Sequence, residues 1–224
     1  MGVHDGHRER KREQFLRHGA DSFADHELLE LLLYSAVPRR DTNPLAHDLI
    51  NHFGSLHAVF SAPAEELQKF SGISQSGAVL LKLIAPIYRR AALSAGENEQ
   101  ILDTVEKIGR FFLNLYVAES REVMYQLCLD AKGRRLNLYK VSDGDPSSVN
   151  LNVRRIVENA ILSQASMVAL AHNHPSGVAF PSPEDIVATT QIQTALDSIG
   201  ICFADHIIAA DGDFVSMRQD GYVH

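Results

Sequence analysis

The feature that most constrains the fold is a change in hydrophobic pattern near the middle of the chain. Before it, apolar residues recur at helical spacing, as in ADHELLELLLYSA at residues 24–36. After it, short apolar runs alternate with helical segments. Between the two patterns lies SAGENEQ at residues 94–100, which is small and polar like a linker. The sequence therefore predicts two domains, residues 1–95 and residues 102–224.

The first domain is predicted to be all-α. Asp25 is the expected N-cap of the helix that ends near residue 36, and Pro44 and Gly54 stand at the expected start and stop of the next helix. The segment LQKFSGISQSGAVLLKL, residues 67–83, resembles a helix-hairpin-helix module, in which a Gly-hydrophobic-Gly turn offers backbone amides to nucleic-acid phosphate. Ser74 stands where the second glycine belongs, so one permissive backbone position is lost.

The charge of the chain disfavours tight duplex binding. Its net charge is −7, whereas neutralising DNA phosphates requires clustered cations. Arg8–Arg12 and the pair Arg39 and Arg40 are local basic clusters that could contact phosphate, but a solvated helix face and a loop explain them better. We therefore expect any DNA binding through the N-terminal domain to be weak.

The composition also bears on compartment. No apolar run approaches the roughly 20 residues that a bilayer span needs, so no membrane partner is expected. The first fifteen residues are charged and lack the apolar core of a secretion signal, which makes the cytoplasm the expected location.

The second region mixes strand and helix patterns. Residues 121–141 form two apolar runs around AKGR and predict a hairpin. A helix at 153–165, a buried strand at 166–174, a helix at 182–200 and two strands within 201–217 follow. This alternation predicts a layered sheet-and-helix domain, so the whole chain belongs to the α+β class.

The segment AHNHPSGVAFPSPED, residues 171–185, is the candidate functional site. His172 and His174 are spaced to share one face of an extended strand, and Asp185 is placed to join them if the intervening loop curls back. Ser182 is the expected helix cap. Two imidazoles and one carboxylate leave a zinc coordination position open, as catalytic sites do. Spacing alone leaves a metal site and an ordinary polar loop equally open.

A family resemblance favours the metal site. The string H-x-H, seven residues, S, two residues, D is met by His172, His174, Ser182 and Asp185, and it is the signature of JAMM (JAB/MPN) metalloproteins. The segments RHGADSFADHELLELLLYSA, AHNHPSG and DHIIAADGDFVSM resemble the bacterial RadC family (UPF0758) over nearly the whole chain.

The resemblance implies a fold and a chemistry. It implies a three-layer α/β/α domain of the cytidine-deaminase-like JAB/MPN type, with Zn²⁺ bound by His172, His174 and Asp185. Glu122, at the start of an early strand, inherits the role of general base, and Ser182 that of stabilising an oxyanion. One departure is Arg155, which stands where RadC-like sequences usually carry Glu; Glu158 lies three residues further on the same predicted helix.

Three functions follow as alternatives. The first is a JAMM-type zinc hydrolase acting on a peptide or isopeptide bond of an unknown protein or peptide substrate. The second is a DNA-repair-associated, DNA-binding factor, and the third is a non-catalytic MPN scaffold. The complete ligand set favours the first, while the sequence names neither the substrate nor the oligomeric state.

Overall fold

The computed structural model describes residues 5–38, 40–95, 101–143 and 153–223. The chain divides into two compact units, Met1–Ile87 and Tyr88–His224. The linker expected at residues 94–101 lies largely outside the described residues, so its position stays a prediction, and Arg39 lies outside them as well.

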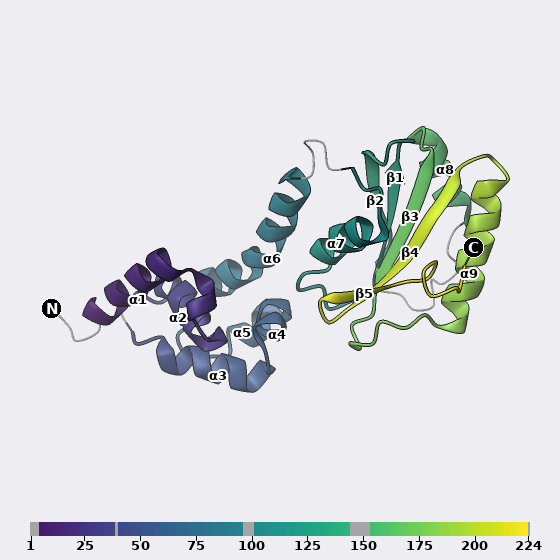
Figure 1. Cartoon of the computed structure of the whole chain (residues 1–224). Helices are drawn as coiled ribbons and strands as arrows, with labels where there is room; N and C mark the ends of the chain where they lie inside the picture. The colour runs from purple at the N-terminus through teal and green to yellow at the C-terminus, as the bar shows by residue number, and fades with distance from the viewer. Residues whose placement is uncertain (1–4, 39, 96–100, 144–152, 224) are drawn as a thin grey trace. The chain divides into compact units, whose positions relative to one another are not determined.

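The first unit is helical, as predicted (Figure 1). Its core is built from leucines of several helices, with Leu33, Leu49 and Leu81 fully buried. The described elements are α1 (Asp5–His18), the short 3₁₀ helix η1 (Ala20–Ser22), α2 (Asp25–Ala36), α3 (Asn43–Phe53), α4 (Leu56–Ser61), α5 (Ala64–Leu67) and α6 (Gln75–Ala95), which continues into the second unit.

The ends of these helices follow local sequence with one exception. Gly54 ends α3 with φ of 91°, a left-handed conformation that glycine adopts without strain. The expected N-cap at Asp25 is wrong, because α2 is capped at Ala24. The Glu27 carboxylate accepts the Ala24 backbone N–H at 3.0 Å, so the third helical residue does the capping.

The turn that resembles a helix-hairpin-helix module uses Ser74 as a helix cap. Gly72 has φ of 110°, and Ser74 Oγ accepts the backbone N–H of Gly77 at 3.2 Å. The serine at the second glycine position therefore starts α6.

The second unit is a mixed five-stranded sheet covered by helices on both faces (Figure 1). The strand order is β2-β1-β3-β4-β5, and only the β3–β4 pair is parallel. Helices α8 and α9 pack on one face and α7 on the other, which gives three layers. The elements are α7 (Val105–Leu115), β1 (Val123–Leu129), β2 (Arg135–Asp143), α8 (Val153–Leu162), β3 (Met167–Asn173), α9 (Pro183–Asp197), β4 (Cys202–Ala210) and β5 (Asp213–Ser216).

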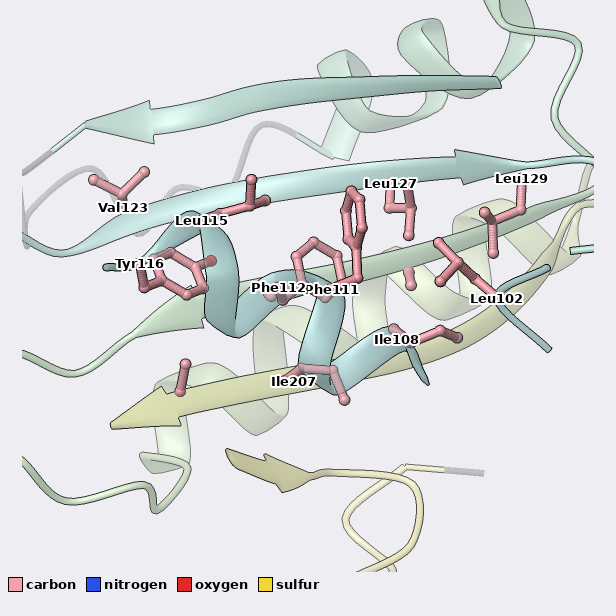
Figure 2. Packing of buried hydrophobic residues seen from close by; sticks show 13 residues of the cluster. Leu102, Ile108, Phe111, Phe112, Leu115, Tyr116, Val123, Leu127, Leu129 and Ile207 are labelled. Atoms are coloured by element: carbon pink, nitrogen blue, oxygen red, sulfur yellow. The ribbon is translucent and has the colours of Figure 1, made fainter. Parts of the chain in front are cut away.

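Helix α7 seals the face of the sheet opposite α9. Figure 2 shows Phe112 and Leu115 of α7 directed at the strands, against Leu127 of β1 and Ile207 of β4. Gly109 lies where the ring of Phe214 in β5 approaches α7, so that an added Cβ would meet ring carbons at 2.3 Å to 2.6 Å. This close approach explains a glycine in the middle of a helix.

Strand alternation sends the candidate site to the other face. Val168 and Leu170 of β3 pack under α8 and α9, and His172 continues that row, whereas Ala169 and Ala171 face α7. Among the described residues, no helix is long and apolar enough to cross a membrane.

Candidate metal centre

Two elements bring the candidate ligands together. His172 lies at the end of β3, 1% exposed at its side chain, and His174 follows one residue after the strand. Gly177, with φ of 85°, turns the chain, and its N–H donates to the His174 carbonyl at 3.1 Å. The loop then returns to Ser182, the N-cap of α9, so the predicted reversal before Pro183 is present.

Ser182 and Asp185 form a reciprocal capping box at the start of α9. Ser182 Oγ accepts the Asp185 N–H at 3.1 Å and donates its own proton to Asp185 Oδ2 at 2.6 Å. The Ser182 backbone N–H donates to the same oxygen at 2.8 Å. Burial raises the pKa of Asp185, but His172 and the two Ser182 donors outweigh it, so the pKa is held below its usual range. The carboxylate is thus ionised and fixed.

His172, His174 and Asp185 form one cluster. Each contributes a ligand atom within 4.8 Å of the others, and within the described ranges no other group of three or more His, Cys, Asp or Glu side chains comes together in this way. His172 Nε2 lies 2.9 Å from His174 Nε2 and 3.5 Å from Asp185 Oδ1, and His174 Nε2 lies 3.9 Å from Asp185 Oδ2.

These separations fit a shared metal ion. Zinc–ligand bonds of roughly 2.0–2.1 Å at tetrahedral angles place two ligand atoms about 3.3 Å apart. The observed separations of 2.9 Å, 3.5 Å and 3.9 Å bracket that value. Two imidazole nitrogens and a carboxylate oxygen suit Zn²⁺, and the same set also suits Fe(II).

The hydrogen bonds of His174 set its tautomer. Its Nδ1 lies 2.9 Å from the Val178 carbonyl, which can only accept, so Nδ1 carries the proton. The Nε2 atom therefore presents a lone pair to the cluster. The loop between the ligands thus orients one of them through its own backbone.

Glu122 lies one residue before β1 and is partly buried. Met124 pairs with His172 in the antiparallel β1–β3 register, and continuing that register by two residues sets Glu122 opposite His174. Glu122 then shares the face of the sheet that carries His172 and His174.

Asn173 holds the segment around Glu122. Its Oδ1 accepts the Val123 N–H at 2.8 Å, and its Nδ2 donates to the Arg121 carbonyl at 3.0 Å. The side chain is buried on the face opposite the two histidines. One amide therefore fixes the backbone on both sides of Glu122. Sequence reasoning missed this residue, since its partners lie about 50 positions away.

Arg155, Glu158 and Asp205 lie apart from this network. Arg155 is exposed on α8, and Glu158 is an exposed partner of Arg154 at 2.7 Å. Asp205 accepts from Ser216 Oγ and from the Arg218 N–H, whereas the neighbouring His206 contacts His172. Strand alternation predicts this separation of Asp205 and His206 onto opposite faces.

Comparison with known proteins finds two family models that match this chain. Residues 102–222 match the model of the RadC-like JAB domain, and residues 6–79 match that of the UPF0758 N-terminal domain. A UPF0758 protein of Desulforudis audaxviator (strain MP104C) is 34% identical over 212 residues, which are 95% of this chain and 92% of that protein.

Proposed function

The chain belongs to the UPF0758 family of proteins with a RadC-like JAB domain, and from this premise we propose that it is a zinc-dependent hydrolase of peptide or isopeptide bonds. Its metal ligands are His172, His174 and Asp185, its general base is Glu122, and its substrate is a protein or peptide.

The observation that carries the proposal is the convergence of three candidate ligand atoms, from His172, His174 and Asp185, within 4.8 Å of one another. His174 keeps its proton on Nδ1, and Asp185 is ionised, so their atoms in the cluster are lone-pair donors. His172 Nε2 stands between them, 2.9 Å from His174 Nε2. A divalent metal ion bound between these atoms would be coordinated by all three residues at once.

The chain's own residues supply the remaining chemistry. A bound zinc would lower the pKa of a coordinated water to around 7 and polarise the scissile carbonyl. In this proposal Glu122, which the continued β1–β3 register sets opposite His174, accepts a proton and delivers it to the leaving amine. Asn173 keeps Glu122 at that position through the backbone on either side. A general base held in place contributes roughly 10²- to 10⁴-fold to the rate.

Ser182 supports the site through Asp185. Its hydroxyl proton is engaged by Asp185 Oδ2 at 2.6 Å, so donation to an oxyanion would require that bond to open. Holding the Asp185 carboxylate in the cluster is the role that this geometry favours for Ser182, and oxyanion stabilisation is the alternative.

The test is turnover by the Glu122→Gln variant. A panel of peptide and isopeptide substrates is assayed with the zinc-loaded protein, and activity must disappear with a chelator. We expect Glu122→Gln to keep its zinc and lose at least 10²-fold in rate, since glutamine cannot take the proton. Glu184→Gln is the matched control, because Glu184 is exposed beside Asp185 and the charge change is identical. Full activity in Glu122→Gln would remove Glu122 from the mechanism.

A second function, DNA binding, is favoured by one contact in the helical unit. Arg40 Nη1 lies 3.3 Å from Ser71 Oγ, beside the turn at Gly72, which sets a cation next to the hairpin. The net charge of −7 opposes tight binding. We therefore rank DNA binding below hydrolysis.

A further inference from the structure

Behind the candidate metal ligands lies a row of buried, hydrogen-bonded polar groups that links two of these ligands. His206 of β4 is fully buried, and its Nε2 lies 2.9 Å from His172 Nδ1. Its Nδ1 lies 2.6 Å from Oγ1 of Thr189, a fully buried residue of α9. Thr189 Oγ1 also lies 2.6 Å from the backbone carbonyl of Asp185. The row therefore runs from His172 to Asp185 behind the site.

The donor and acceptor of each hydrogen bond can be assigned starting from the Asp185 backbone carbonyl, which can only accept. The Asp185 carbonyl has no proton, so Thr189 must donate to it. The Thr189 hydroxyl has no second proton, and it therefore accepts from His206 Nδ1–H. The His206 ring is fully buried with its proton on Nδ1, and in that tautomer of imidazole the other nitrogen, Nε2, is an acceptor.

The last bond then fixes the tautomer of a metal ligand. Because His206 Nε2 accepts, His172 Nδ1 must donate, which leaves Nε2 as the ring nitrogen that can bind a metal ion. That atom is the one within the cluster, 2.9 Å from His174 Nε2. We propose that Thr189 and His206 are positioning residues that hold His172 as the Nδ1–H tautomer and fix Asp185, so that both ligands face the metal.

This inference rests on the proposed function, since it assumes that the cluster binds zinc. It goes beyond the JAMM motif, because the spacing of that motif predicts the metal ligands but includes neither Thr189 nor His206. Partners that hold a histidine ligand's second ring nitrogen raise metal affinity, and their loss typically costs about 10- to 100-fold. The proposed metal site thus depends on the Thr189 hydroxyl, which joins α9 to His206 of β4 and is not itself a metal ligand.

The test uses three threonine variants of the full chain. Thr189→Val removes the hydroxyl at nearly constant shape, whereas Thr189→Ser keeps it. Thr190→Val is the matched control, because Thr190 Oγ1 also donates to the carbonyl four residues back, at 2.8 Å, on the exposed side of α9. The readouts are zinc affinity by competition with a chelator and the visible spectrum of the Co²⁺-substituted protein, neither of which requires a substrate.

We expect Thr189→Val to weaken zinc binding about 10- to 100-fold and to alter the Co²⁺ spectrum, with Thr189→Ser and Thr190→Val close to wild type. Wild-type affinity in Thr189→Val would overturn the positioning role alone. Equal losses in Thr189→Val, which lacks the hydroxyl, and in Thr189→Ser, which keeps it, would show that the effect does not depend on the hydroxyl and would also overturn the positioning role. A wild-type protein that binds no zinc would instead overturn the proposed metal site, and this assignment with it.

Discussion

Replacing Ser182 with alanine tests whether this residue only caps α9 or also holds the Asp185 carboxylate for metal binding. The hydroxyl makes two bonds with Asp185: it accepts the backbone N–H at 3.1 Å and donates to the carboxylate at 2.6 Å. Loss of a cap costs about 1 kcal/mol. Loss of a hydrogen bond to a charged group costs about 1.5–3 kcal/mol. The carboxylate cannot recover this bond fully from water, because the Asp185 side chain is only 13% exposed.

We therefore expect Ser182→Ala to lower the free energy of unfolding by about 2–4 kcal/mol in the metal-free protein. Thr104→Ala is the matched control. Thr104 caps α7 in the same unit, accepting the Lys107 N–H at 3.3 Å, and this bond involves none of the candidate metal ligands. Its replacement should cost about 1 kcal/mol and leave zinc binding unchanged.

The assay is urea unfolding with a chelator present, followed by far-ultraviolet circular dichroism, since the chain contains no tryptophan. Zinc affinity is then measured on both variants, and we expect Ser182→Ala alone to bind zinc about 10- to 100-fold more weakly. Equal stability losses in the two variants, with wild-type zinc affinity in Ser182→Ala, would show that Ser182 is a cap and nothing more.

Three further predictions concern the packing, the domain boundary and nucleic acid. Gly109→Ala should lower the stability of the second unit by about 1–3 kcal/mol, because the added Cβ meets the Phe214 ring at 2.3 Å; a more stable variant in urea unfolding would refute this contact. Limited proteolysis should cut first within residues 94–101 and release two folded pieces, and a first cut within 122–141 would contradict the boundary. DNA binding, titrated at low and physiological salt, should be weak and lost with salt, so tight binding at both would make DNA a main partner.

Local signals in the sequence predicted the local geometry of the candidate ligands well. Ser182, Pro183 and Asp185 are one helix start, and the structure places them as cap, first residue and third residue of α9. His172 and His174 share a face because an extended backbone alternates with a period of two. Such features depend on neighbours in the chain, so they can be predicted from spacing.

Helix α7 was missed although its signals are present. Thr104 is a side-chain cap, and apolar residues recur at helical spacing after it. These residues are Val105, Ile108, Phe111, Phe112 and Leu115. The second covering layer of the sheet therefore came from the family resemblance, and a periodicity count over residues 101–120 would have found it.

The hydrogen-bond partners of three other residues could not be predicted from spacing. These residues are Asn173, Thr189 and His206. Their partners are set by which strands lie side by side, and β1 pairs with β3 although the two are separated by β2 and α8. A polar residue in a buried strand signals that a partner exists, and the topology alone identifies it.

The most direct test of the account is the metal content of the protein. Purified protein, dialysed against metal-free buffer, is analysed by inductively coupled plasma mass spectrometry beside the His174→Ala variant. The proposed zinc site requires about one zinc per wild-type chain and none in His174→Ala, because the variant removes one of the three proposed ligands. Iron in place of zinc, or zinc retained unchanged by His174→Ala, would contradict it.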